Sequence, residues 1–211
     1  MKLYSYFRSS AAYRVRIALA LKGLKYEQVP VELRRGEQRH AEFHAVNPQE
    51  LVPALEAGGH LLTQSLAIIE YLEETHPQPP LLPADAPGRA RVRALALAVA
   101  CDLHPLNNLR VLQHLRSALG QSEDQVNAWY RHWIAVTLSA LEPMVAHGAG
   151  RFCHGDAPGM ADILLVPQLT NARRFDCDLT AYPTLVRIDQ TCRALPAFIA
   201  AAPENQPDAA G

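Results

Sequence analysis

Residues 8–16 read RSSAAYRVR, and the fold of the N-terminal region can be predicted outward from them, because they join a predicted strand to a predicted helix. The residues just before it, Leu3 to Phe7, are mostly of the apolar and aromatic types that favour strands. After Ser9 the apolar side chains fall at helical spacing as far as Gly23, a residue type that commonly ends helices. The stretch therefore predicts a strand, a turn with two hydroxyl groups, and a helix.

A serine at the start of a helix has two possible roles. The common one is structural, because a serine oxygen often accepts a hydrogen bond from a backbone N–H of the first turn. The other is to hold an anion, since the free first-turn N–H groups and the helix dipole both favour negative charge at that end. A thiolate is such an anion. Ser9 and Ser10 are therefore candidates both for a helix cap and for a thiolate site.

The composition is that of an ordinary globular protein, with no strong charge to draw it to nucleic acid or membrane. Of the 211 residues, 20 are Lys or Arg and 21 are Asp or Glu, which leaves a net charge of -1. No apolar run reaches membrane-spanning length, and Arg8, Arg14 and Arg16 interrupt the region where a signal peptide would need its apolar core. We expect a cytoplasmic protein that binds neither nucleic acid nor membrane.

The first 80 residues carry the signals of an α/β domain. A second strand is predicted over residues 26–33, and Pro30 places it at an edge or ends it early. A short helix over residues 40–45, a third strand, a hairpin turn at Gly58-Gly59 and a helix capped by Ser65 follow. The order βαβαββα predicts a thioredoxin-like domain over residues 1–80.

The cysteine pattern argues against redox and metal chemistry. Residues 9–12 stand where a thioredoxin carries its C-x-x-C motif, so a disulfide oxidoreductase is not expected. The chain also lacks any C-x-x-C pair that would suggest a metal site. We expect free thiols in the core or on the surface at Cys101, Cys153, Cys177 and Cys192.

The second half of the chain predicts an all-helical domain over residues 88–211, after a proline-rich linker at residues 76–87. Helices are expected over residues 89–119 with a break at Pro105, from a capping box at Ser122 and Gln125, and over residues 160–175 and 182–195. From Pro203 the polar, proline-containing tail is expected to be disordered. The fold class is thus α/β plus all-α.

The stretch from Arg8 to Gly23 resembles the signature of the zeta class of glutathione transferases, and residues 160–175 match a second long block of that family. Ala11 departs from the pattern, since many members carry cysteine there. The resemblance implies a glutathione-dependent homodimer. It also implies a cis–trans isomerase of aromatic compound degradation, which converts maleylpyruvate or maleylacetoacetate to the fumaryl isomer; the sequence does not choose between these two substrates.

The resemblance also implies how glutathione is held. Ser9, with Ser10 as runner-up, faces the thiolate; Val52 before a cis Pro53 pairs with the cysteinyl unit; and Gln64 and Ser65 bind the γ-glutamyl carboxylate. The remaining contacts are Gln38 and His40 at the glycyl end, Gln49, and a helix segment facing the sulfur with His104, Asn108 and Arg110. Plainer interpretations stay open, namely a trans Pro53, Ser65 as a simple N-cap, and a kinked helix with exposed polar residues.

Arginines separate the possible reactions. An isomerase of this type adds a thiolate to an activated cis double bond, and its diacid substrate develops an enolate that arginines suit by charge and geometry. Arg8, Arg110 and Arg174 are the candidates for that role. A general conjugating transferase would need an apolar pocket instead, and a noncatalytic glutathione-binding protein would need no such groups.

Overall fold

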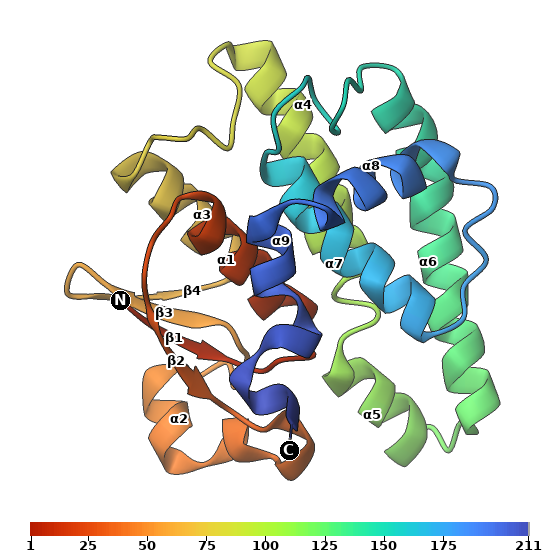
Figure 1. The fold of residues 1–211 in the computed structure, drawn as a ribbon. Coiled ribbons are helices and arrows are strands. Elements are labelled where there is room, and N and C mark those ends of the chain that lie inside the picture. Colours follow the sequence, from red (N-terminus) through yellow and green to blue (C-terminus); the bar gives the residue numbers. More distant parts are fainter. Residues whose placement is uncertain (211) are drawn as a thin grey trace. The chain divides into compact units, whose positions relative to one another are not determined.

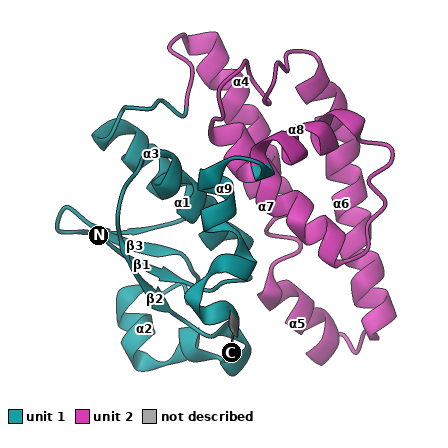
Figure 2. Ribbon diagram, in the orientation of Figure 1, with its two compact units in different colours: residues 1–81, 193–211 teal, residues 82–192 magenta. Residues whose placement is uncertain are grey.

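The structure, a computed structural model, describes residues 1–210 and divides into two compact units (Figure 1). The first unit comprises Met1–Leu81 and Arg193–Gly211, teal in Figure 2, and the second comprises Leu82–Cys192, in magenta. The predicted domains covered residues 1–80 and 88–211, so the two divisions differ mainly in the C-terminal segment. This segment lies with the first unit because its helix α9 (Pro196–Ala201) packs against α1 (Ser10–Leu21).

The first unit contains a four-stranded sheet in the order β2-β1-β3-β4. Its strands are β1 (Lys2–Ser5), β2 (Glu27–Pro30), β3 (Ala54–Ala57) and β4 (His60–Thr63). β1 pairs in parallel with β2 and antiparallel with β3, and β3 and β4 form the predicted hairpin. Pro30 ends β2 at the edge of the sheet, as predicted, where a missing N–H costs least.

Side chains of β1 alternate between the two faces of the sheet. Ser5 is fully buried on the face covered by α1, and Tyr4 packs on the other face against Phe43 of α2 (Ala41–Val46), with 5.9 Å between ring centroids. α1 is the central helix of the unit, since it packs against α3 (Ser65–Thr75) as well as α9 (Figure 1). Its residues from Ser10 to Leu19 are all buried.

The second unit is built of helices. In chain order they are α4 (Ala86–Leu97), a π-helical segment (Ala98–Leu103), α5 (Leu109–Ser117), α6 (Glu123–Ala146), α7 (Met160–Arg174) and α8 (Pro183–Arg193). α7 is buried along most of its length and packs against α4. Together with the sheet of the first unit, these helices confirm the predicted α/β plus all-α fold class.

Side chains cap the starts of α6 and α7. Ser122 Oγ accepts from Gln125 N at 3.3 Å, and Gln125 Oε1 accepts from Ser122 N at 2.8 Å, which is the predicted capping box. At the start of α7, Asp162 accepts hydrogen bonds from the backbone N–H groups of Gly159 (2.8 Å) and Cys153 (2.9 Å). Burial raises the pKa of Asp162, and its bonds to backbone indicate a role in folding.

The region predicted as a helix over residues 89–119 starts earlier than expected and contains the expected break. α4 begins at Ala86, inside the predicted linker, because Asp85 caps it and Pro87 stands in the first turn, where a missing N–H costs nothing. The break expected at Pro105 is confirmed, because a turn at that position separates the preceding helical residues from α5. The π-helical segment before the turn was not predicted. Asn108 then caps α5 as a new helix.

The C-terminal tail is ordered as far as Ala210, so the expectation of disorder from Pro203 was wrong for these residues. Two short 3-10 helices, Pro203–Asn205 and Pro207–Ala210, follow α9. Gln206 Nε2 donates to the carbonyl oxygens of Ala200 and Ala202 at 2.9 and 2.8 Å. The composition lacked large apolar residues, but polar side chains hold the segment in place instead.

Among residues 1–210, no helix combines the length and apolar character needed to cross a membrane. The same residues include no group of three or more His, Cys, Asp or Glu side chains placed to hold a metal ion. The four cysteines are free thiols, with Cys153 and Cys192 buried and Cys101 exposed. Burial raises the pKa of both buried thiols, which makes them poor nucleophiles.

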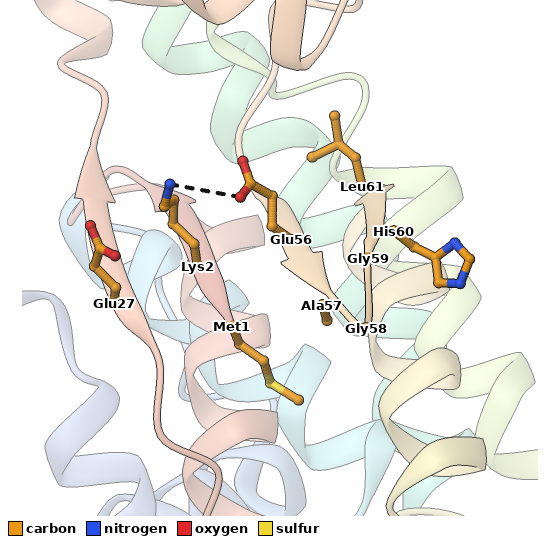
Figure 3. A pocket seen from close by; sticks show the side chains of 9 residues that line it. All are labelled: Met1, Lys2, Glu27, Glu56, Ala57, Gly58, Gly59, His60 and Leu61. Atoms are coloured by element: carbon orange, nitrogen blue, oxygen red, sulfur yellow. Dashed lines mark ion pairs between the residues drawn. The ribbon is translucent and has the colours of Figure 1, made fainter.

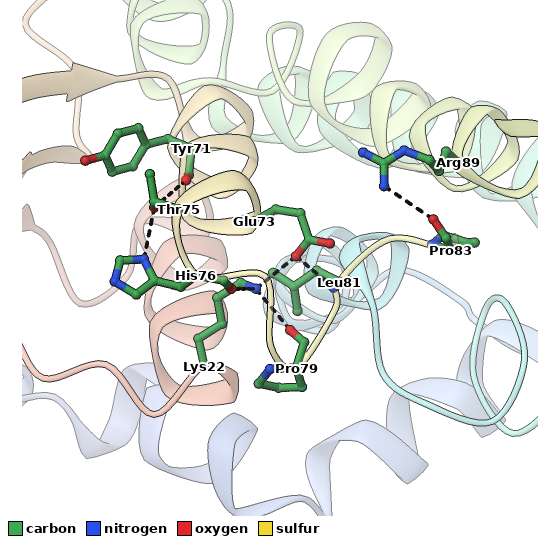
Figure 4. A network of polar contacts seen from close by, with 9 residues as sticks. All are labelled: Lys22, Tyr71, Glu73, Thr75, His76, Pro79, Leu81, Pro83 and Arg89. Carbon is green, nitrogen blue, oxygen red and sulfur yellow. Dashed lines mark hydrogen bonds and ion pairs between the residues drawn. The ribbon is translucent and has the colours of Figure 1, made fainter. Parts of the chain in front are cut away.

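A buried ion pair fixes the end of the sheet-containing domain (Figure 4). Lys22 Nζ lies 2.9 Å from Glu73 Oε2 and also donates to the carbonyl oxygens of His76 and Pro79. Glu73 Oε2 accepts a further hydrogen bond from Leu81 N at 2.9 Å. The pair therefore ties the C-terminal ends of α1 and α3 to the proline-rich segment that follows them.

Replacing Lys22 with Met should lower the free energy of unfolding by about 3 kcal/mol, because the Glu73 carboxylate would stay buried without its cation. Lys25→Met removes the same charge at an exposed position and should change stability by less than about 0.5 kcal/mol. Urea unfolding followed by circular dichroism compares the two variants. Equal stabilities would show that the ion pair contributes nothing.

Candidate functional site

Ser9 is the N-cap of α1 and ends the turn that follows β1. Its Oγ accepts a hydrogen bond from Ala12 N at 3.2 Å, and its own backbone N–H donates to Tyr6 O at 2.9 Å. A hydroxyl that accepts one hydrogen bond still has its proton to donate. The two roles considered for this serine are therefore compatible: the oxygen caps the helix while the O–H can face an anion. Ser9 is partly exposed, whereas Ser10 is 7% exposed.

The start of α3 forms a second possible anion site. Ser65 is its first residue, and the N-cap is Gln64, so the prediction of Ser65 as the N-cap was off by one residue. Ser65 Oγ accepts from Nη1 of Arg14 at 3.4 Å in the buried interior of the unit. The site therefore combines a hydroxyl, a buried guanidinium and the positive end of a helix.

Arg14, which contacts this possible anion site through Ser65, was not among the site residues predicted from the sequence. It is 1% exposed and lies in the fully buried part of α1, among apolar residues such as Val15 and Ala18. A charged residue among core positions needs polar partners, because burying an unpaired charge is costly. That mismatch between charge and helical position is the signal that could have found it.

Gln64 holds a strained backbone conformation, with φ 67° and ψ 118°, a region that residues other than glycine rarely adopt. Its side-chain Nε2 donates to Gln49 Oε1 at 2.9 Å, so two of the predicted glutathione contacts are brought together. Strain of this kind persists only where the surroundings enforce it, and it occurs often at ligand sites. Nearby, the Val52-Pro53 peptide bond is cis, as the family resemblance implied.

Gln38 and His40 lie just before α2 and differ in exposure. Gln38 is 7% exposed, and its side-chain oxygen accepts no hydrogen bond from any described residue. A buried amide oxygen without a donor is costly to leave unsatisfied, so a ligand donor would satisfy it. His40 is exposed and precedes α2 without capping it through its side chain.

In the second unit the predicted segment follows the π-helical turn. His104 N donates to Val99 O at 2.9 Å, the wider spacing of a π-helix, which occurs often at functional sites. Asn108 Oδ1 accepts from Arg110 N at 3.1 Å and caps α5, so these two residues are neighbours in one turn. The Asn108 oxygen is thus already engaged with backbone, whereas the Arg110 side chain is exposed.

The three candidate arginines are all exposed. The Arg8 guanidinium lies 5.0 Å from the centroid of the Phe7 ring, and that of Arg174, at the end of α7, lies 5.1 Å from the ring of Phe175. Arg173, by contrast, forms an ion pair with Asp189 at 2.5 Å. Arg174 is therefore better placed than its neighbour to meet a ligand.

A cavity of about 580 Å³ lies at the other end of β1 from Ser9 (Figure 3). Lys2 Nζ is 3.7 Å from Glu56 Oε2 there, and Tyr4 Oη donates to Glu56 Oε1 at 2.6 Å, which helps to raise the pKa of Tyr4 to about 12. Because these groups satisfy one another, we assign the cavity no ligand. It is lined by Met1, Lys2, Glu27, Glu56, Ala57, Gly58, Gly59, His60 and Leu61.

Known proteins with similar sequences and structures include glutathione S-transferases and isomerases. The family model for the N-terminal domain of glutathione S-transferases matches residues 1–74. A probable maleylacetoacetate isomerase of Vibrio cholerae is 56% identical over 98% of this chain and 97% of its own length. The holo structure of a maleylpyruvate isomerase, described as a bacterial zeta-class glutathione S-transferase, is 51% identical, with a TM-score of 0.97 over 99% of both chains.

A maleylacetoacetate isomerase from Anaeromyxobacter dehalogenans is a further relative. Its structure with glutathione bound in the active site is 55% identical to this chain, with a TM-score of 0.90 over 99% of this chain and 97% of the other. A second structure holds dicarboxyethyl glutathione and citrate in the active site, at 53% identity and a TM-score of 0.88 over 99% and 96% of the two chains.

The backbone strain at Gln64 predicts that glycine is more stable than alanine at this position, the reverse of the usual order of the two residues in a helix. Gln64→Gly should be about 1 kcal/mol more stable than Gln64→Ala, because glycine adopts a positive φ without steric cost. At the exposed helical position of Ala67 the order should reverse, with Ala67→Gly about 1 kcal/mol less stable than the wild type. Urea unfolding of the three variants tests this, and a Gln64→Ala protein as stable as Gln64→Gly would contradict the strain.

Proposed function

The chain belongs to the zeta-class glutathione transferase family, and from that premise we propose that it is a glutathione-dependent cis–trans isomerase. Its substrate is maleylpyruvate or maleylacetoacetate, its product is the fumaryl isomer, and its place is the degradation of aromatic compounds. Relatives above 50% identity carry the names of these isomerases. The observation that carries the proposal is Ser9, a partly exposed hydroxyl at the N-terminus of a buried helix.

The residues of the first unit suit glutathione. The Ser65 hydroxyl, backed by Arg14, and the first-turn N–H groups of α3 would hold the γ-glutamyl carboxylate, with Gln64 and Gln49 alongside. The backbone of Val52, before the cis proline, would pair with the cysteinyl unit. Gln38 and His40 would contact the glycyl end, where the Gln38 oxygen needs a donor. His104, Asn108 and Arg110 would face the sulfur.

When bound, glutathione supplies the thiolate that adds to the cis double bond and leaves after the carbon–carbon bond has rotated. The task of Ser9 is to favour that thiolate, because a free thiol has a pKa of about 8.5 and is mostly protonated at neutral pH. Its O–H would donate toward the sulfur while its oxygen keeps the hydrogen bond from Ala12 N. The N-terminus of α1 adds positive potential at the same place.

The substrate carries two carboxylates and gains a further negative charge at its carbonyl oxygen during addition. Arg8, Arg110 and Arg174 are proposed to bind these charges, because guanidinium groups match carboxylates in charge and geometry. Their exposure supports this role, since none of the three is already in an ion pair among the described residues. The dicarboxyethyl glutathione bound by the Anaeromyxobacter relative likewise carries two carboxyl groups on the part attached to glutathione.

We further propose that the protein works as a homodimer in the cytoplasm, as the family resemblance implies. Light scattering of the purified protein would test the first statement, and fractionation of the source cells the second.

Turnover of maleylpyruvate and of maleylacetoacetate, each with and without glutathione, tests the reaction directly. We expect fumaryl product only when glutathione is present, and slow conjugation of chlorodinitrobenzene. Fast conjugation without isomerisation would instead identify a general transferase, and glutathione binding without turnover a noncatalytic protein.

Removing the Ser9 hydroxyl should lower kcat by roughly 10 to 1000-fold, the usual loss when one anion-stabilising donor is removed. Ser9→Ala also loses a helix cap, at a cost of about 1 kcal/mol, so Ser9→Asp serves as the companion variant. Aspartate keeps the cap but offers no proton to a thiolate, and it should be as inactive as alanine while remaining stable. Activity assays and thermal unfolding separate the two effects. If Ser10→Ala lowers kcat strongly and Ser9→Ala leaves kcat unchanged, the assignment of Ser9 as the thiolate donor is wrong.

Arg110→Ala should raise KM for the diacid and, if the guanidinium also meets the developing enolate, lower kcat. Its affinity for glutathione should stay nearly unchanged, because the glutathione carboxylates are assigned elsewhere. Arg116→Ala is the matched control, since Arg116 lies on the same helix but is engaged by Glu123. Steady-state kinetics with Arg8→Ala and Arg174→Ala completes the set. If Arg8→Ala, Arg110→Ala and Arg174→Ala all keep the wild-type KM and kcat, these arginines do not form a dicarboxylate pocket.

A further inference from the structure

The peptide that leads into the Ser9 turn is held from two sides. Phe7 N donates to Asp208 Oδ2 at 2.9 Å, and Phe7 O accepts from Nη2 of Arg16 at 3.1 Å. The carbonyl oxygen of Tyr6 accepts from Arg16 Nη1 at 3.4 Å and from Ser9 N at 2.9 Å. Both backbone groups of Phe7 therefore have fixed partners, one on α1 and one near the C-terminus.

Arg16 supplies the inner half of this arrangement. Its side chain is fully buried and also donates to Ser5 Oγ at 3.0 Å and to Ala201 O at 2.9 Å. Burial lowers the pKa of its guanidinium to about 10, while the charge of Asp208 acts in the opposite direction. Arg16 thus stays charged at neutral pH, and the negative charge of Asp208 favours its charged form.

Asp208 supplies the outer half from the last short helix, Pro207–Ala210. Its second oxygen, Oδ1, accepts from Gln28 Nε2 at 3.0 Å, so the carboxylate bridges the Phe7 backbone to β2. Ala209, the next residue, packs against the apolar cluster that contains Phe7. The segment is therefore seated by both polar and apolar contacts, although it is 201 residues away from Phe7 in the sequence.

We propose that Asp208 is a positioning residue that sets the place of the Ser9 hydroxyl by fixing the peptide of Phe7. The inference rests on the proposed role of Ser9 at the thiolate. Residues 6–9 form one closed turn, because Ser9 N bonds back to Tyr6 O. A shift of the Phe7 peptide is passed directly to Ser9, and small misplacements of a catalytic group are costly to the rate.

Asp208 could act through its hydrogen bond to Phe7 or through its charge alone, and these two roles predict opposite shifts in the pKa of the bound thiol. If Asp208 acted only as a nearby negative charge, removing it would favour the thiolate and lower the pKa of the bound thiol. If it acts by holding Phe7, losing its hydrogen bond loosens the Ser9 donor, and the pKa of the bound thiol rises. The other charged groups around Phe7 are Arg16 and the guanidinium groups of Arg8 and Arg34 above its ring, and these stay constant in the comparison.

Two substitutions separate these accounts. Asp208→Asn keeps an oxygen for Phe7 N but loses the charge, and the Gln28 amide can turn to meet the new NH2 group. Asp208→Glu keeps the charge but displaces the carboxylate by one methylene. Glu204→Ala, at an exposed position on the same segment, is the control for lost negative charge. Ultraviolet absorbance of the thiolate, titrated with pH in the glutathione complex, gives the pKa of the bound thiol, and steady-state kinetics gives kcat and KM.

For Asp208→Glu we expect the pKa of the bound thiol to rise by about one pH unit and kcat at neutral pH to fall roughly ten-fold, with little change in KM for glutathione. Asp208→Asn and Glu204→Ala should stay close to the wild type. A lower thiol pKa in Asp208→Asn, with Asp208→Glu unchanged, would overturn the inference in favour of charge alone. The inference would also be overturned if the wild-type protein left the pKa of the glutathione thiol unchanged on binding. A wild type that lowers the thiol pKa but does not isomerise the diacid would refute the proposed function and leave this inference standing.

Discussion

The buried guanidinium of Arg16 is the interaction on which the first unit depends. A charged group without solvent is tolerated only when its donors are satisfied, and Arg16 donates to a side chain of β1, to the two carbonyl groups that follow the strand, and to Ala201 in α9. One side chain thus fastens the strand, the central helix and the C-terminal segment together. It also explains why the last residues of the chain belong to the sheet-containing unit and not to the helical one.

Local patterns in the sequence predicted most of the fold. The strand, turn and helix around Ser9, the hairpin at Gly58-Gly59 and the capping box at Ser122 each involve residues close together in the chain, so composition and spacing carry the information. Even Pro30 predicted its own position at an edge, because its missing N–H restricts where it can stand.

What could not be predicted depends on contacts between distant residues. The order of the tail rests largely on Asp208, whose partners, the backbone N–H of Phe7 and the side chain of Gln28, lie far away in the sequence, so no local pattern identifies them. The break before α5 was foreseen from Pro105, but the π-helical turn that precedes it was not, since it depends on how the helix packs. Most predicted glutathione residues came from family resemblance, and Arg14 was missed although its charge among core positions was visible.

We propose that the hydroxyl of Ser9 receives the sulfur of glutathione, and a crystal structure of the glutathione complex would test this placement. We expect the sulfur within about 3.5 Å of Ser9 Oγ, with the γ-glutamyl carboxylate on Ser65 at the start of α3. A sulfur that contacts Ser10 or another side chain and leaves Ser9 without contact, or a glutathione molecule whose carboxylate lies away from Ser65, would contradict it.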